Sequence, residues 1–473
     1  MTGGGRPASA RRARAKLRFM VKAGAARQAS GAAFLVDHML GDWVMAHKPA
    51  TNRRLIMAGI IGNVMEWYDF AVYGYFAIVI GKLFFPSDDP SVSLIAAYGA
   101  FAAGFLARPI GGLLLGRLGD LIGRRHVLIV SILCMALPTF LMGALPTQAE
   151  IGIMAPLLLV LLRIIQGLSV GGEFTSSSVF LAERAQAGQR GLLTSWSIWG
   201  AVLGILLGSL VGTLLTGTLD DQQILRWGWR VPFLIGPLLA LLGLILRRGL
   251  LDEPGQGVEP GDSAAQGAAR PKAPLVSLLT ENFPDVLRIV CLNIANGVGF
   301  YLVFVYSVSY MKGIDKLDGS LAFEINSFNM ALLLLVLPAG AWLSDRWGRK
   351  PLLAAGLLIL AVGALPAFTL IHSQDWRAVT LGQFILASGV GLLAGSVCVT
   401  NVEMLPRHNR CTGVALSYNL AVGVFGGTAP LMAAWMITAG GNPIAPGYYL
   451  LAVALLGLAT LFFVKESAHR PLP

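Results

Sequence analysis

The stretch Leu118-Gly119-Asp120-Leu121-Ile122-Gly123-Arg124-Arg125 recurs as Leu343-Ser344-Asp345-Arg346-Trp347-Gly348-Arg349-Lys350, each time between long apolar runs. Another pair of motifs recurs at a similar offset, because Glu183 precedes Arg190 and Glu403 precedes Arg410 by the same spacing. Polar signatures that recur in order between membrane-length segments indicate two parallel repeats of one architecture.

The composition is that of a membrane protein. Of the 473 residues 55% are hydrophobic and only 13% are charged, with a mean hydropathy of +0.68. A membrane helix needs about 20 apolar residues, and twelve such segments can be placed. They are expected to begin near Leu55, Val92, His126, Ile151, Gly191, Trp229, Asp285, Phe323, Pro351, Trp376, Cys411 and Pro446. The sequence therefore predicts an all-α polytopic membrane protein with twelve transmembrane helices in two six-helix halves.

The polar segments divide the chain. We expect a basic cytoplasmic tail at 1–50, an N-terminal half at 51–248, a cytoplasmic linker at 249–284, a C-terminal half at 285–466 and a short cytoplasmic tail at 467–473.

The basic residues predict the orientation. With both termini and every even-numbered gap in the cytoplasm, 28 of the 36 Lys and Arg lie inside, six lie outside and two lie within the membrane. This asymmetry follows the positive-inside rule. It also explains the net charge of +11 without a nucleic-acid partner, since no basic face carries interleaved aromatic residues.

Enzyme, metal and cofactor chemistry find no support. The four cysteines lack CxxC spacing, and no P-loop or H-E-x-x-H motif occurs. Residues 167–171 match G-x-S-x-G but lie in a predicted membrane helix, where Gly167 and Gly171 favour close helix packing instead. No histidine lies at mid-membrane depth, so any proton carrier is expected to be a carboxylate.

Ionisable residues at membrane depth are the candidate functional groups. Ions are costly there and mark functional sites by default. They and their polar neighbours are Asn63, Glu66 and Asp69 on the first helix, Arg108 on the second, and Arg163, Gln166 and Glu173 on the fourth. We expect Glu66 or Asp69 to pair with Arg108 or Arg163 across a cavity; the alternative is static ion pairs that only fix helix register. Polar contacts from the other half are expected from Asn296, Tyr301 and Tyr306.

These motifs resemble a known family. Asn63-Val64-Met65-Glu66-Trp67-Tyr68-Asp69-Phe70, Ala107 to Gly112, Asp120 to Arg125 and Arg163 to Glu173 are similar to those of the metabolite:proton symporters of the major facilitator superfamily. The similarity runs from about Asn52 to Lys465. It implies proton-coupled uptake of a small molecule across a bacterial inner membrane by alternating access, in a functional monomer.

The resemblance also implies a cytoplasmic gate. In the superfamily the aspartate of the repeated stretch contacts a helix of the other half. The gate residues expected here are Asp120, Arg124, Arg125, Glu183, Arg190, Asp345, Arg349, Glu403 and Arg410. The alternative is that the arginines of these motifs only set the orientation of the chain in the membrane, by the positive-inside rule. That alternative would not explain the acidic residues that recur with them.

Substrate and coupling follow as expectations. Glu66, Asp69 and Glu173 are candidate proton acceptors, while Arg108 and Arg163 are candidate ligands for a carboxylate, which suits their planar fork. Two intramembrane arginines favour a di- or tricarboxylate. The alternatives are a zwitterionic osmolyte such as proline or betaine, and a sensor that binds a metabolite without moving it.

Overall fold

The computed structural model describes residues 52–122, 124–170, 172–186, 188–238, 274–373 and 375–473. Within these ranges some side chains are not described, including those of Asp120, Arg124, Arg125 and Glu173. The predicted tail at 1–50 and most of the predicted linker lie outside the described residues. The chain divides into residues 1–55 and 56–473.

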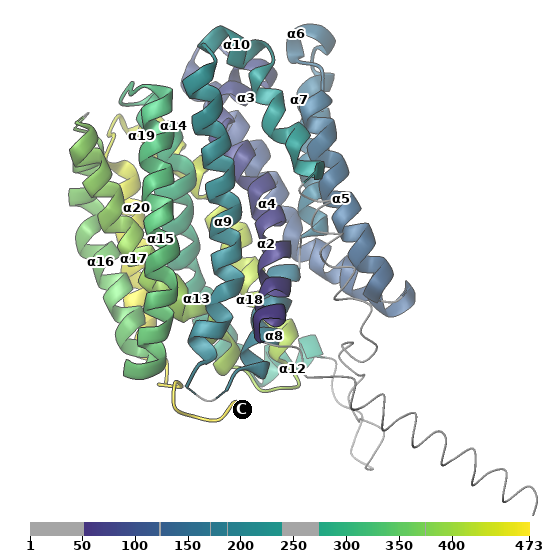
Figure 1. Ribbon diagram of the computed structural model, residues 1–473, viewed down its shortest axis with the longest axis vertical. Helices are drawn as coiled ribbons and strands as arrows, with labels where there is room; N and C mark the ends of the chain where they lie inside the picture. Colours follow the sequence, from purple (N-terminus) through teal and green to yellow (C-terminus); the bar gives the residue numbers. More distant parts are fainter. Residues whose placement is uncertain (1–51, 123, 171, 187, 239–273, 374) are drawn as a thin grey trace, which may run out of the picture. The chain divides into compact units, whose positions relative to one another are not determined.

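The N-terminal half is a set of helices joined by short connections (Figure 1). They are α2 (Asn52–Tyr75), α3 (Ala77–Phe84), α4 (Pro90–Ile122), α5 (Arg124–Ala144), α6 (Gln148–Ile151), α7 (Met154–Ser169), α8 (Glu173–Arg184), α9 (Arg190–Thr218), α10 (Asp221–Arg226) and the 3₁₀ turn η1 (Gly228–Arg230), followed by a helical segment at 231–238.

The C-terminal half follows the same plan. Its helices are α12 (Pro274–Thr280), α13 (Phe283–Phe300), η2 (Tyr301–Tyr306), α14 (Ser307–Gly313), α15 (Gly319–Trp347), α16 (Arg349–Ile371), α17 (Trp376–Glu403), α18 (Arg410–Leu420), η3 (Ala421–Gly426), α19 (Gly427–Gly440) and α20 (Ala445–Leu461). The η2 and η3 segments are π-helical and join α13 to α14 and α18 to α19 without a break.

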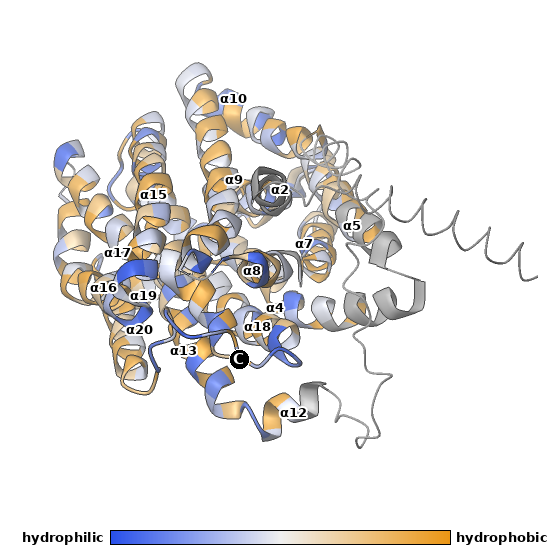
Figure 2. Ribbon diagram, turned by 60° about the horizontal axis from the view of Figure 1, so that its bottom comes forward, coloured by the Kyte–Doolittle hydropathy of each residue, from blue (hydrophilic) through white to orange (hydrophobic). Residues whose placement is uncertain are grey.

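The predicted membrane segments are confirmed. Each begins within four residues of its expected position, and the start at Trp376 is the same. Among the described residues, eight helices are long and apolar enough to cross a membrane, and two shorter apolar helices accompany them. Figure 2 shows hydrophobic residues along the helix sides and hydrophilic residues gathered at helix ends and connections. This is the distribution that a bilayer imposes on spanning helices.

The fourth segment differs from the prediction. The sequence analysis places Gln166 and Glu173 on one helix, but α7 ends at Ser169 and α8 begins at Glu173. Val170 and Gly172 lie outside both helices, and glycine disfavours continued helix.

The two halves pack directly on each other. Helix α9 lies against α15, and α4 lies against α19. Ser209 of α9 and Ser327 of α15 are joined by a hydrogen bond of 2.8 Å, and Trp199 Nε1 donates to the carbonyl of Leu334 at 3.0 Å. The interface between the halves is therefore closed along these helices, and the candidate site lies inside it.

Candidate substrate and proton site

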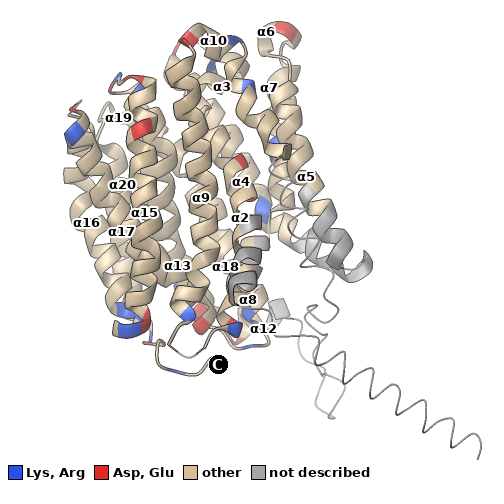
Figure 3. Cartoon of the chain, in the orientation of Figure 1, with Lys and Arg blue, Asp and Glu red and all other residues tan. Residues whose placement is uncertain are grey.

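Four ionisable side chains lie buried at mid-depth in the N-terminal half. They are Glu66 and Asp69 of α2, Arg108 of α4 and Arg163 of α7, and each is at most 3% exposed. Figure 3 shows that most other described charges lie near the two ends of the helices. The sequence predicted this grouping, and the helices bring all four together.

Asp69 is connected to Arg163 through two neutral side chains. Thr139 Oγ1 lies 2.9 Å from Asp69 Oδ2 and accepts a hydrogen bond of 2.7 Å from Gln166 Nε2. The Gln166 carbonyl oxygen in turn accepts from Arg163 Nη1 at 2.6 Å. The Arg163 guanidinium also lies over the Tyr73 ring, 4.3 Å from its centroid. Asp69 and Arg163 are thus held in fixed positions without direct contact.

Glu66 and Arg108 form a much looser pair. Arg108 Nη2 lies 3.9 Å from Glu66 Oε1, beyond the range of a direct hydrogen bond. The guanidinium is held instead between aromatic faces, 4.1 Å from the Phe105 centroid and 4.3 Å from the Phe70 centroid. Arg108 Nε and Nη2 have no hydrogen-bond partner among the described residues. This arginine is therefore positioned by its neighbours and able to accept another anionic group.

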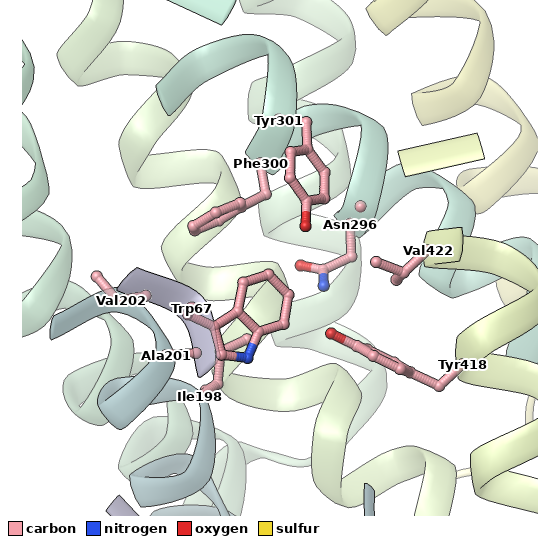
Figure 4. A pocket seen from close by; sticks show the side chains of 10 residues that line it. Trp67, Ile198, Ala201, Val202, Asn296, Phe300, Tyr301, Tyr418 and Val422 are labelled. Atoms are coloured by element: carbon pink, nitrogen blue, oxygen red, sulfur yellow. The ribbon is translucent and has the colours of Figure 1, made fainter. Parts of the chain in front are cut away.

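Two cavities adjoin this loose pair. A cavity of about 160 Å³, here called the charged cavity, is lined by Glu66, Arg108, Val170, Gly172, Phe174, Thr175, Tyr418 and Asn419. A larger cavity of about 330 Å³, here called the aromatic cavity, is lined by Trp67, Ile198, Ala201, Val202, Asn296, Gly297, Phe300, Tyr301, Tyr418 and Val422 (Figure 4). Tyr418 lines both, so the two cavities are neighbours at the interface of the halves.

Aromatic rings enclose much of the larger cavity. The Trp67 ring lies 6.4 Å from that of Tyr301, nearly parallel to it, and 6.3 Å from that of Phe300. On the opposite side, Tyr418 stacks on Phe174 with a centroid distance of 4.7 Å. In Figure 4 the Tyr301 hydroxyl and the Asn296 amide point toward the centre of the cavity.

Some of the predicted pocket residues line the cavities and others do not. Asn296 and Tyr301 line the aromatic cavity as expected, and Asn63 is buried one turn before Glu66. The Tyr306 ring packs against Tyr98 and Tyr310, and Tyr306 is not among the residues that line the two cavities described above. The side chain of Glu173 lies outside the described residues.

Sequence reasoning missed several members of the site. Trp67, Phe300 and Tyr418 line the aromatic cavity, and Thr139 joins Asp69 to Gln166. Aromatic residues are common in membrane helices, so the sequence alone does not single out Trp67, Phe300 and Tyr418. What distinguishes them is that they come together from both halves to line one cavity. The sequence does not indicate a role for Thr139, because a lone threonine on an apolar helix usually donates a hydrogen bond to the backbone of its own helix. The Thr139 hydroxyl also does so here, to the carbonyl of Met135.

At one end of the bundle, ion pairs join the two halves. Glu403 of α17 accepts from Arg190 Nη1 of α9 at 2.9 Å and from Arg349 Nε of α16 at 3.1 Å. Glu183 accepts from Arg410 Nη1 at 2.6 Å. The Glu and Arg residues that are seven apart in the sequence are therefore not paired with each other. Each Glu pairs with the Arg of the other half.

Asp345 completes this cluster, here called the gate cluster. Its carboxylate accepts from the backbone N–H groups of Gly191 and Leu192, at 2.8 and 2.9 Å, and from Arg349 Nη1 at 2.8 Å. The first turn of α9 offers unpaired N–H donors and a favourable dipole to an anion. The first copy of the repeated stretch cannot be compared, because the side chains of Asp120, Arg124 and Arg125 are not described.

The segment after α20 also contributes to this end. Glu466 accepts from the backbone N–H groups of Arg349 and Lys350 at 2.8 and 3.0 Å, and Ser467 Oγ donates to Glu403 at 2.7 Å. Burial would raise the pKa of Glu466, but these backbone donors outweigh it and hold the pKa below its usual value. The carboxylate therefore stays ionised and covers the first turn of α16.

Comparison with known proteins identifies the family. A family model described as "Sugar (and other) transporter" matches residues 55–253 and 261–473. The chain belongs to this transporter family. Its members are membrane transporters of the major facilitator superfamily and not enzymes, in agreement with the prediction.

Relatives and solved structures extend the comparison. The proline/betaine transporter of Salmonella typhimurium is 38% identical over 425 residues, covering 89% of this chain and 85% of that protein. The glycine betaine/proline/ectoine/pipecolic acid transporter OusA of Dickeya dadantii is 37% identical over 424 residues, covering 89% and 84%.

A structure of the proton:xylose symporter XylE, bound to a bromo-deoxyglucose, superposes with a TM-score of 0.69 at 19% identity, covering 90% of this chain and 98% of that one. The XylE of E. coli in a partially occluded inward-open state gives a TM-score of 0.67, also at 19% identity, over 89% and 99%. At these identities the likeness shows the fold alone. The all-α architecture with two six-helix halves is thereby confirmed as the major facilitator fold.

Proposed function

We propose that this chain is a proton-coupled symporter that takes up a small zwitterionic osmolyte of the proline or betaine kind by alternating access. The observation that carries the proposal is the charge of the site. Among the described residues, the buried acids Glu66 and Asp69 are matched by Arg108 and Arg163. A zwitterion adds one positive and one negative group, so it enters without leaving an uncompensated charge in the membrane interior.

A di- or tricarboxylate fits this site less well. It would bring two or three negative charges to two arginines, of which Arg163 is already hydrogen-bonded to Gln166 and lies over the Tyr73 ring. Of the two arginines, Arg108 lines the charged cavity, whereas Arg163 is not among the residues that line either cavity described above. The arginine count favoured an organic acid, whereas the placement of those arginines and the names of the relatives favour the zwitterion.

Coupling is assigned to the loose pair of Glu66 and Arg108. A substrate carboxylate that binds Arg108 competes with Glu66 for the same guanidinium. Glu66 then loses the neighbouring charge of Arg108 and binds a proton more readily, because a nearby cation favours the ionised carboxylate. Substrate and proton binding thus promote each other. Asp69, Arg163 and Gln166 would hold the surrounding charges in place.

We assign the gate cluster to the cytoplasmic side of a bacterial inner membrane. The support is the excess of Lys and Arg in the segments that join the helices at this end. Its cross-half ion pairs would close the cytoplasmic path while substrate enters from outside. We assign the monomer as the functional unit.

Uptake by proteoliposomes tests the substrate class. Purified protein is reconstituted into vesicles with an alkaline interior, and the accumulation of radiolabelled trimethylglycine is measured. We expect accumulation that a protonophore abolishes, competition by excess proline, and no competition by citrate or 2-oxoglutarate. Competition by the carboxylates but not by proline would support an organic acid instead, while binding without uptake would support a sensor.

A further inference from the structure

The aromatic cavity has the chemical character of a site for an organic cation. Four of its lining side chains are aromatic, namely Trp67, Phe300, Tyr301 and Tyr418, and none of its described lining residues is ionisable in the acid range. A cation within about 6 Å of an aromatic centroid is attracted by the negative face of the ring, and the attraction grows when water is excluded.

Polar side-chain atoms also line this cavity. Trp67 Nε1, the Asn296 amide oxygen and the Tyr301 hydroxyl are buried without a hydrogen-bond partner among the described residues. Burying a polar atom without a hydrogen-bond partner costs folding free energy, and a bound ligand or water can supply the missing hydrogen bond. The amide oxygen suits a positive group, whereas the indole N–H can only donate and suits a carboxylate oxygen.

The charged cavity lies next to it, on the other side of Tyr418. The Arg108 guanidinium carbon lies 5.4 Å from the Trp67 ring centroid, so the arginine and the aromatic rings are within reach of one small molecule. A ligand with a carboxylate at Arg108 would place a group one carbon away beside Trp67 and Tyr418.

We infer that the aromatic cavity binds the quaternary ammonium head of a betaine, through the ring faces of Trp67, Tyr301 and Tyr418, while the betaine carboxylate binds Arg108. This inference rests on the proposed function and adds the recognition of the cationic head to it. A methylated nitrogen has no N–H group and cannot donate a hydrogen bond. A site made of hydrogen-bond acceptors would therefore bind water in preference to it, whereas aromatic faces attract its positive charge. The cavity would therefore prefer a methylated ammonium group to an uncharged group of the same shape.

A pair of isosteric probes separates charge from shape. Trimethylglycine and 3,3-dimethylbutanoate have the same shape, but the second carries a carbon atom in place of the cationic nitrogen. Binding of each to the purified full chain is measured by calorimetry. We expect trimethylglycine to bind at least about tenfold more tightly, a ratio that corresponds to roughly 1.4 kcal/mol and lies in the range of desolvated cation–π contacts.

Variants of Tyr418 then test the rings. Tyr418→Leu should reduce this ratio severalfold by weakening trimethylglycine alone, whereas Tyr418→Phe, which keeps the ring, should retain the preference. Tyr449→Leu removes a partly buried ring of α20 outside the cavity and should leave both affinities unchanged. Thermal unfolding of each variant identifies any that fail to fold. If Tyr418→Leu fails to fold, the affinity ratio of the two probes in the native chain and in Tyr418→Phe still tests the inference.

The outcomes distinguish this inference from the proposed function. If the two probes bind the native chain equally while proline and trimethylglycine are still taken up, the aromatic recognition is wrong and the osmolyte symporter stands. If Tyr418→Leu weakens both probes alike, the ring acts through shape and the inference is likewise overturned. If the native chain binds neither trimethylglycine nor proline, both proposals fail together.

Discussion

Glu66 Oε1 and Arg108 Nη2 lie 3.9 Å apart inside the membrane. This distance is too long for a hydrogen bond, but at this distance the two charges still attract each other. Asp69 and Arg163, by contrast, are fixed by a chain of hydrogen bonds through Thr139 and Gln166. A pair that must exchange partners during transport has to be the loosely held one. The difference between the pairs is the reason for assigning coupling to Glu66.

Glu66→Gln should separate transport from proton coupling. The amide cannot take up a proton, so substrate should still exchange across the membrane but no longer accumulate. A pH gradient of one unit stores about 1.4 kcal/mol per proton, enough for about tenfold accumulation by the native protein. The measurement compares steady-state uptake with counterflow in proteoliposomes. Glu324→Gln, at an exposed acid of α15, is the control, and persistent accumulation by Glu66→Gln would exclude the assignment.

Arg108→Lys should weaken substrate binding although the charge is kept. The guanidinium stacks on Phe105 and Phe70 and offers a planar fork, whereas an ammonium group does neither in the same way. We expect the KM for trimethylglycine to rise by about tenfold or more, at an unchanged melting temperature. Arg377→Lys makes the same change at an exposed arginine beside Trp376 and should have no effect. Equal KM values for the two variants would contradict a substrate contact.

At the scale of elements, close helix contacts hold the site together. A Cβ atom on Gly167 of α7 would lie 1.8 Å from the carbonyl oxygen of Gly104 on α4, and one on Gly111 would lie 2.1 Å from the Leu168 carbonyl oxygen. The two backbones touch here because both helices carry glycine. The sequence prediction that Gly167 serves close packing is confirmed.

Gly167→Ala should therefore destabilise the protein, since the clash is with backbone and the helices must separate. We expect a cost of about 1–3 kcal/mol, seen as a melting temperature lower by several degrees. Gly217→Ala is the matched control, because nothing lies within 4 Å of its Cβ position and alanine is the better helix former. Equal melting temperatures for the two variants would show that the contact between α4 and α7 is loose.

The elements were predictable to very different degrees. Helix starts could be read from the sequence because apolar length and flanking charges determine them locally, as at Trp376 and Arg410. The break at Val170 and the π-helical segment at Tyr301 could not, since they depend on packing against other helices. Similarly, the sequence indicated Glu183, Arg190, Glu403 and Arg410 as a set, but their crossed pairing exists only once the two halves meet.

At the scale of the whole molecule, the gate cluster holds one end closed. Glu403 is 6% exposed and receives hydrogen bonds from Arg190, Arg349 and Ser467, whereas the Glu183 side chain is 39% exposed and pairs only with Arg410 among the contacts described. Breaking a buried pair leaves charges uncompensated and costs about 3–5 kcal/mol, while an exposed pair contributes at most about 1 kcal/mol. The closed state should therefore depend on Glu403 far more than on Glu183.

Glu403→Gln should open this end of the molecule. Cys398 lies buried on α17, and its labelling by a maleimide reports access once Cys134, Cys291 and Cys411 are replaced by serine. We expect Glu403→Gln to raise the labelling rate by about tenfold or more and Glu183→Gln to raise it much less. Equal rates in the two variants would mean that the cluster does not control access.

The most direct test of the central claim is the movement of protons with the zwitterion. Proteoliposomes are suspended in weakly buffered medium without a pH gradient, and the external pH is recorded as trimethylglycine is added. We expect the external medium to become alkaline as substrate enters, and we expect Glu66→Gln to abolish this change while substrate still equilibrates. Entry of trimethylglycine into native vesicles with no change in external pH would contradict it.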